Sequence, residues 1–293
     1  MYFVIIILGD EFMGILYVVA TPIGNLSDIT KRALDILNSV DIILCEDTRT
    51  SSVLLKHFNI NKKLVSYHKF NEKEKSNSLI SDLISGKNMA LISDAGSPCI
   101  SDPGSILVNA AIKNNIEVIS IPGASAVITS LMCSGMNTES FTFYGFLDRT
   151  NKKIDEELEI IKNDSSNIAV IYESPKRIIK TLNKVKEILD NPYICLCNDL
   201  TKKFEKKYYG NTDKVLDELS NNLNSELGEY VLLIEKKKEE KKDSCELSIE
   251  SLIIDEMVKN SCTMKEAIKL VSEKYKINKN IVYNSSLNLK KIL

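Results

Sequence analysis

The sequence predicts an α/β protein with two α/β domains, the first with a mostly parallel sheet and the second with a mixed sheet, followed by a small helical module. Three observations support this prediction. Over residues 15–134, five strongly apolar segments alternate with amphipathic helical segments. After Gly135 the alternation restarts, and two later strand segments follow each other without a helix between them. From residue 247 onward only helical periods remain.

In the first domain, placed at residues 14–136, each predicted strand is followed by a predicted helix. The first strand, residues 15–20, leads through a turn to a helix that Ser27 can cap. The later pairs are strand 41–45 with helix 51–58, strand 64–67 with a helix ended by Gly86, strand 88–94 with helix 105–114, and strand 117–121 with a helix from Ala124. Such alternation favours a parallel sheet covered on both faces.

The second domain, residues 137–236, has predicted strands at 141–147, 168–172, 193–197, 204–209 and 229–235. Its helices are predicted from Lys152, after residue 172 with Pro175 in the first turn, and from Thr212. A charged linker covers residues 236–243. The third domain, residues 245–293, has three short helices, one capped by Thr263, and these resemble a helix-turn-helix module.

The composition indicates a soluble globular protein that can bury a full core. The chain has 293 residues, of which 44% are apolar and 27% charged, with a net charge of −2. Seven scattered cysteines indicate free thiols in the cytoplasm, and their spacing predicts no metal site. The nearest pair, Cys195 and Cys197, is predicted to point to opposite faces of a strand. The apolar run at residues 3–8 is too short to cross a membrane, and residues 1–12 are either an upstream extension or an edge strand.

The charge is distributed unevenly along the chain. From Lys236 to the end there are 13 lysines and 9 acidic residues, so this tail carries +4. The preceding residues are therefore acidic. The tail is either a contact for a polyanionic partner or a solvated lysine-rich surface.

Small and acidic residues gather where the strands of the first sheet end, which is where ligands bind in open α/β sheets. The longest such loop is Ser93-Asp-Ala-Gly-Ser-Pro-Cys-Ile-Ser-Asp-Pro-Gly104, and it contains Asp94 and Asp102. The sequence has neither the dinucleotide nor the phosphate-binding glycine fingerprint. The two carboxylates suit a cationic, hydroxyl-bearing ligand such as S-adenosylmethionine. The alternative is that both aspartates only cap turns.

Five runs follow one another over residues 14–235: Val19-Ala-Thr-Pro-Ile-Gly-Asn-Leu-Ser-Asp-Ile-Thr30, Glu46-Asp-Thr-Arg49, the loop Ser93 to Gly104, Tyr144-Gly-Phe-Leu147 and Tyr172-Glu-Ser-Pro-Lys-Arg177. In this order they resemble the bacterial 16S rRNA (cytidine-2'-O)-methyltransferases of the tetrapyrrole methylase superfamily. The resemblance implies S-adenosylmethionine-dependent methylation of a cytidine ribose in the decoding region of the small ribosomal subunit. It also implies a homodimer that holds the cofactor in the cleft between two sheets.

The same resemblance implies a set of cofactor-binding residues: Pro22, Asp94, Ala95, Gly96, Ser97, Ile100, Ser125, Ala126, Tyr172, Asn198 and Leu200. Two positions depart from the pattern of the family. Ala124 stands where proline is usual, and Asn198-Asp199 stands where an Arg-Glu pair is usual. No arginine contact is therefore assigned at the second position.

Methyl transfer to a ribose hydroxyl is an in-line displacement that needs alignment and a proton acceptor. Candidate acceptors at strand ends are Glu46, Asp47, Asp102 and Glu173. Arg49, Lys176 and Arg177 are candidates for neighbouring RNA phosphates. The alternative for the run from Glu46 to Arg49 is an internal salt bridge that closes the loop. The two histidines, without a Ser or Cys partner, are more typical of ordinary polar residues.

The run from Lys202 to Tyr209 contains four lysines and three aromatic residues. We assign Lys202 and Lys203 to RNA binding and the aromatic residues to a lysine-protected edge strand. Two alternative functions stay open. One is carbon methylation of a tetrapyrrole, and the other is a non-catalytic RNA-binding factor in ribosome assembly.

Overall fold

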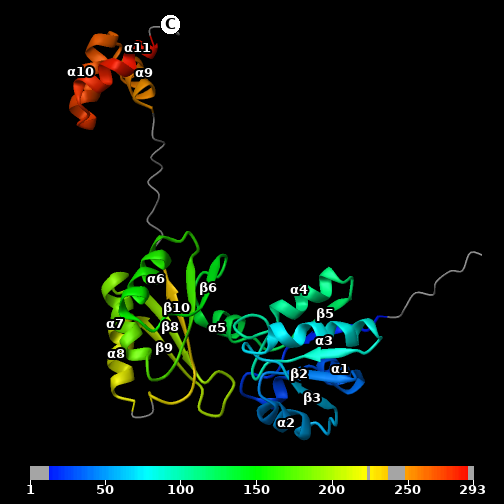
Figure 1. The fold of residues 1–293 in the computed structure, drawn as a ribbon. Coiled ribbons are helices and arrows are strands. Elements are labelled where there is room, and N and C mark those ends of the chain that lie inside the picture. The colour runs from blue at the N-terminus through cyan, green and yellow to red at the C-terminus, as the bar shows by residue number, and fades with distance from the viewer. Residues whose placement is uncertain (1–12, 223–224, 237–247, 290–293) are drawn as a thin grey trace, which may run out of the picture. The chain divides into compact units, whose positions relative to one another are not determined.

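The computed structural model describes residues 13–222, 225–236 and 248–289, and it divides the chain into one unit up to Lys237 and another from Lys238. The first unit holds two five-stranded sheets (Figure 1). The second unit is helical. The predicted α/β class, with a parallel first sheet and a mixed second sheet, is confirmed.

The first sheet has the strand order β3-β2-β4-β1-β5, and all its pairs are parallel. Its strands are β1 (Leu16–Val19), β2 (Ile42–Cys45), β3 (Lys63–Ser66), β4 (Met89–Leu91) and β5 (Val118–Ile121). Its helices are α1 (Lys31–Ser39), α2 (Thr48–His57), α3 (Glu72–Ile84), α4 (Ser105–Lys113) and α5 (Ala126–Ser134). Alternate residues of the strands pack on opposite faces. Leu44 lies in the core with α3 and α4, whereas Ile43 lies in the core with α1 and α2.

The second sheet has the order β6-β7-β10-β8-β9, with one parallel pair, β6 and β7, and three antiparallel pairs. Its strands are β6 (Phe141–Phe146), β7 (Ile168–Glu173), β8 (Tyr193–Asn198), β9 (Lys206–Asn211) and β10 (Tyr230–Glu235). Helices α6 (Asn151–Asn163), α7 (Ile178–Ile188) and α8 (Thr212–Ser220) cover one face. Helix α5 packs against the other face through Val127 and Leu131 (Figure 1). Helix α5 follows β5 of the first sheet in the chain and packs on the second sheet.

Three local predictions are wrong. Ser27 lies in a single 3-10 turn, η1 (Leu26–Asp28), and α1 is capped by Thr30, whose Oγ1 accepts the Ala33 N–H at 3.1 Å. Pro175 precedes α7 instead of entering its first turn, because the helix begins at Ile178.

The predicted orientation of the cysteine pair is also wrong. The Cys195 and Cys197 sulfurs lie 3.8 Å apart in the core under α5. Side chains in a strand alternate at every residue, so residues two apart share a face.

The second unit is a three-helix bundle formed by α9 (Ile249–Asn260), α10 (Met264–Tyr275) and α11 (Lys279–Leu289). It has its own core, which includes Ile253, Val271 and Val282. Thr263 caps α10 as predicted, in a reciprocal capping box with Glu266. The predicted alternatives for residues 1–12, and most of the predicted linker, lie outside the described residues.

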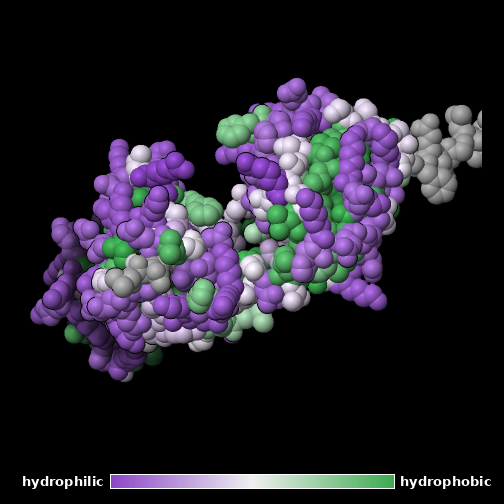
Figure 2. All heavy atoms as spheres, turned by 90° about the horizontal axis from the view of Figure 1, so that it is seen from below, coloured by the Kyte–Doolittle hydropathy of each residue, from purple (hydrophilic) through white to green (hydrophobic). Residues whose placement is uncertain are grey.

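The face shown in Figure 2 is mostly hydrophilic, and its larger hydrophobic areas lie on the right-hand part of the view. No helix in the described ranges is long and apolar enough to cross a membrane.

Candidate active site

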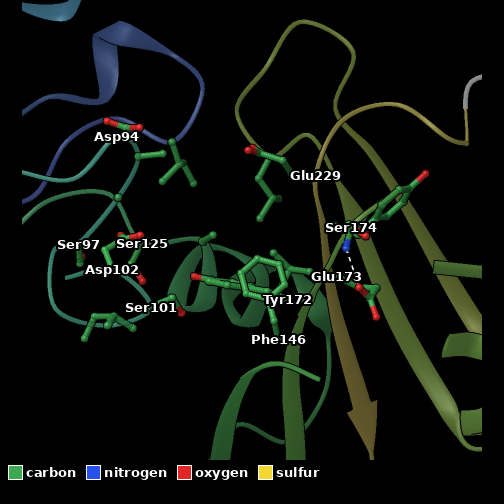
Figure 3. A pocket seen from close by; sticks show the side chains of 18 of the residues that line it. Asp94, Ser97, Ser101, Asp102, Ser125, Phe146, Tyr172, Glu173, Ser174 and Glu229 are labelled. Atoms are coloured by element: carbon green, nitrogen blue, oxygen red, sulfur yellow. Dashed lines mark hydrogen bonds between the residues drawn. The ribbon is translucent and has the colours of Figure 1, made fainter. Parts of the chain in front are cut away.

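A cavity of about 420 Å³ lies where loops of the first domain face strand ends of the second. Such a volume is typical of small-molecule sites. On one side, in Figure 3, lie the side chains of Asp94, Ser97, Asp102 and Ser125. Across from them lie Phe146 and Tyr172, from β6 and β7.

The loop after β4 is held against the loop after β1 by backbone hydrogen bonds. Thr21 and Gly96 exchange two of them, at 2.9 and 3.1 Å, and Ser93 Oγ donates to the Gly96 carbonyl at 3.1 Å. Gly96 has φ +78°, and a Cβ there would lie 3.2 Å from Ile23. Glycine is therefore needed at this position, both for the backbone conformation and for the close approach.

Two aspartates on the acidic side of the cavity, Asp94 and Asp102, have raised pKa values. Burial, reinforced by the negative charges of Glu46 and Asp94, raises the pKa of Asp102 to about 6. Loss of solvation also raises the pKa of Asp94, whose Oδ1 accepts the Asp47 N–H at 3.2 Å. No lysine or arginine lines this cavity among the residues that the structure describes. The site is therefore suited to a cation and to hydroxyl groups, not to phosphates.

The opposite wall is aromatic and apolar. The Tyr172 ring packs edge-on against Phe143 and Phe146, with centroid distances of 4.8 and 5.5 Å. Ile23 and Leu200 add aliphatic surface from the two domains. Such a wall is suited to a flat aromatic ligand group.

A second cavity adjoins the first at the carboxyl ends of β2 and β3. It is lined by Glu46, Asp47, Thr48, Arg49, Ser66, His68, Lys69, Phe70 and Asp94. Arg49 binds Asp47 with both ends of its guanidinium, the shortest contact being 2.6 Å, and this lowers the pKa of Asp47 to about 2. Asp94 lines both cavities. The two spaces therefore share a carboxylate at their junction.

The sequence model of a family described as "Tetrapyrrole (Corrin/Porphyrin) Methylases" matches residues 15–216. The chain belongs to this methylase family. Among curated proteins, the methylase is 43% identical to a protein of Halalkalibacterium halodurans, over 92% of this chain and 94% of the relative. It is 42% identical to one of Haemophilus influenzae, over 94% of this chain and 98% of the relative. Both relatives are named "Ribosomal RNA small subunit methyltransferase I".

Solved structures with the same fold are more distant in sequence. One is a uroporphyrin-III-C-methyltransferase from Thermus thermophilus, with a TM-score of 0.55, 18% identity, and coverage of 76% of the methylase and 94% of that chain. Another is a diphthine synthase, with a TM-score of 0.59, 14% identity, and coverage of 76% and 90%. At these identities the comparison shows the fold alone, and it agrees with the predicted tetrapyrrole methylase-like architecture.

The structure brings most of the predicted cofactor residues of the methylase together around the first cavity. Those that line it are Asp94, Ala95, Gly96, Ser97, Ile100, Ser125, Ala126, Tyr172 and Leu200. Pro22 and Asn198 do not line it. Pro22 is buried beside the lining residue Ile23, and the Asn198 side-chain amide donates to the carbonyls of Leu227 and Glu229 at 3.3 and 3.4 Å. Asn198 thus holds the loop before β10.

The sequence reasoning missed several lining residues: Ile23, Ser101, Phe146, Ser174, Pro175, Glu229, Tyr230 and Val231. Phe146 lies in the predicted strand 141–147, and Ser101 lies in the loop from Ser93 to Gly104, so both lie in segments that the sequence had already marked. The sequence did not mark residues 229–231 as part of a site, because they reach the cavity only through the position of β10 between β7 and β8.

Of the predicted proton acceptors, Asp102 and Glu173 line the first cavity, while Glu46 and Asp47 line the second. Glu173 is only 2% exposed. One carboxylate oxygen contacts Arg177 Nε at 3.2 Å, and the other accepts from Thr181 Oγ1 at 2.6 Å. Arg177 also donates to the carbonyls of Leu147 and Asp148. The ion pair between Glu173 and Arg177 therefore holds the loop that follows β6 against the loop that follows β7.

The predicted RNA-binding lysines differ in their surroundings. Lys176 and Lys203 are exposed, and Lys203 lies 5.5 Å from the Phe204 ring centroid. Lys202 contacts Asp199 at 2.8 Å and Glu229 at 3.0 Å, next to the cavity. A Cβ on Gly24 would lie 2.5 Å from the Lys202 side chain, so glycine lets the loops of the two domains meet there. The loops of the two domains thus lie close together at Gly24 and Lys202.

Proposed function

We propose that the protein uses S-adenosylmethionine to methylate the ribose 2'-hydroxyl of a cytidine in the decoding region of 16S rRNA, in the small ribosomal subunit. The observation that carries the proposal is identity above 40% with proteins named ribosomal RNA small subunit methyltransferase I, over nearly the whole chain. The choice of a cytidine 2'-hydroxyl rests on the five sequence runs that resemble the 2'-O-methyltransferase family.

The residues of the first cavity fit S-adenosylmethionine. The aromatic wall around Tyr172 suits the flat adenine, and Asp94 and Asp102 suit the ribose hydroxyls and the positive charges. Ser97 and Ser125 add hydroxyl partners. When bound, this cofactor supplies an electrophilic methyl group on a sulfonium cation.

Asp102 is the candidate whose pKa best suits it to accept the proton of the attacking hydroxyl. Its pKa of about 6 leaves it mainly ionised at neutral pH while it remains basic enough to accept a proton. Glu173 is less suitable, because both of its oxygens are already engaged by Arg177 and Thr181. Asp94, at the junction of the two cavities, orients the groups on either side.

The tetrapyrrole alternative has less support from the comparisons. The relatives above 40% identity are named for ribosomal RNA, whereas the uroporphyrin-III-C-methyltransferase is only 18% identical. A binding-only assembly factor would not need a carboxylate whose pKa is raised toward neutrality beside the cofactor site.

The proposal includes a cytoplasmic homodimer, as the family resemblance implies. Two exposed apolar residues on one face of α5, Ile128 and Met132, offer contact surface beside the cavity residues Ser125 and Ala126. Light scattering of the purified protein would measure its mass in solution.

A transfer assay tests the proposed activity. Purified protein is incubated with small-subunit particles and tritiated S-adenosylmethionine, and the RNA is digested to nucleosides. We expect label in 2'-O-methylcytidine alone. Label in another nucleoside would refute the assigned position, and label only in an added porphyrin precursor would support the tetrapyrrole alternative. No transfer to any substrate, with cofactor binding intact, would support the binding-only factor.

A further inference from the structure

An exposed phenylalanine stands at the second cavity. Phe70 is 95% exposed, more than any other large hydrophobic residue in the described part of the chain, and it lines this cavity. An aromatic side chain that stays in water does not contribute the favourable free energy that its burial would provide. A phenylalanine so exposed, beside a cavity that shares Asp94 with the first cavity, indicates a partner that covers its ring.

The turn that carries Phe70 is held by hydrogen bonds on both sides. The His68 N–H donates to Asn71 Oδ1 at 2.9 Å, and the Asn71 N–H donates back to the His68 carbonyl at 2.9 Å. The Ser66 carbonyl, at the end of β3, accepts from Asn71 Nδ2 at 3.3 Å and from Lys75 Nζ at 2.7 Å. The turn is thus fixed to the sheet, and the ring of Phe70 is presented on a preorganised support.

The second cavity combines carboxylates with basic side chains. Glu46 and Asp94 can accept hydrogen bonds from hydroxyl and amino groups. The charge of Asp47 is already compensated by Arg49. Lys69 is exposed and places a positive charge among the lining residues, where it can meet an RNA phosphate.

We propose that the second cavity receives the nucleoside to be methylated, with its base stacked on Phe70. RNA bases that are turned out of a strand are commonly recognised by stacking on an aromatic side chain. Asp94 belongs to both cavities, so a ribose in the second lies next to the contents of the first. This inference rests on the proposed function, because it assumes that RNA is the substrate.

The test compares Phe70→Leu with Phe70→Tyr. Leucine keeps apolar bulk without a ring, whereas tyrosine keeps the ring. Val53→Ala is the matched control, because Val53 is an apolar residue that is 66% exposed on α2 and lines neither cavity. The measurements are kcat/KM for small-subunit particles at saturating S-adenosylmethionine, and cofactor affinity by calorimetry.

We expect Phe70→Leu to lower kcat/KM about 5- to 150-fold, the range that base–aromatic stacking covers. Phe70→Tyr and Val53→Ala should stay close to the wild type, and cofactor affinity should not change in any variant. Wild-type activity of the Phe70→Leu variant would overturn the inference. It would indicate that Phe70 makes an apolar contact with a ribosomal protein, which leucine can also make, and does not stack on a base. Equal losses for the leucine and tyrosine variants would also overturn it. If the wild type itself transferred no methyl to the particles, the proposed function would be the part that fails.

Discussion

Asp102→Asn separates the chemistry of the site from the stability of the fold. If Asp102 is the proton acceptor, kcat/KM of the wild type should follow its ionisation, with a pKa of about 6. A group with that pKa is about 9% ionised at pH 5 and about 91% ionised at pH 7, so activity should rise roughly tenfold between them. The asparagine variant should lose about 10²- to 10⁴-fold in activity, as expected for removal of a general base.

The same substitution should stabilise the protein without cofactor. Folding raises the pKa of Asp102 from 3.8 to about 6. The folded protein therefore loses stability as the pH rises from 3.8 through 6, because the buried carboxyl ionises less readily than the same group in the unfolded chain. Partial exposure screens the charge, and we expect Asp102→Asn to add about 1 to 2 kcal/mol at pH 8 and almost nothing at pH 4.

Calorimetric melting at these two pH values, together with the pH dependence of methyl transfer, checks both parts. Glu46→Gln removes a neighbouring negative charge and should move the activity limb to lower pH. A kcat/KM that is flat between pH 5 and 7, or an asparagine variant with near-normal turnover, would refute the role of Asp102. A melting temperature that does not depend on the substitution at pH 8 would contradict the raised pKa.

Three further predictions concern binding. Asp94→Ala should weaken the binding of S-adenosylmethionine, because Asp94 lines the cofactor cavity. Calorimetry in a buffer that contains a chelator and no added metal measures this affinity, and an unchanged affinity would exclude the contact. Arg49→Ala should lower methyl transfer far more than cofactor affinity, and it should leave the melting temperature nearly unchanged, since its ion pair with Asp47 is exposed to solvent; an equal loss of thermal stability would indicate a structural salt bridge instead. Deletion of residues 245–293, whose described helices form their own core, should keep cofactor binding, raise the apparent KM for particles and flatten the salt dependence of binding; identical salt slopes would exclude a docking role.

The order and type of the elements could be predicted because each has a clear pattern of its own. The run Ile42 to Cys45 is apolar throughout and is buried on both faces, as a central parallel strand requires. Helix starts were harder to predict. Ser27 and Thr30 are both good capping residues three positions apart, and only the geometry of the preceding loop decides between them.

The first half of the cofactor cavity could be predicted, since Asp94 to Ser97 directly follow a buried strand in the sequence. The second half could not, because Glu229 reaches the cavity through the antiparallel pairing of β10 with β7 and β8. A similar limit applies to Glu173 and Arg177. Their spacing permits a salt bridge, but only the packed structure shows that Thr181 completes the pair and engages the second carboxylate oxygen.

The strand order of the first sheet has a consequence for synthesis of the chain. Strand β1 is made first, yet both its neighbours, β4 and β5, follow about 70 and 100 residues later. At about 5 to 20 residues per second, the nascent chain carries an apolar, unpaired β1 for several seconds. Only β2 and β3 can pair early, and β4 must then enter between β2 and β1. Strands β1 to β4 can therefore come together only once β4 has emerged, and β5 is added to β1 afterwards. Slowing translation before Met89 should lengthen the time during which the emerging chain depends on chaperones.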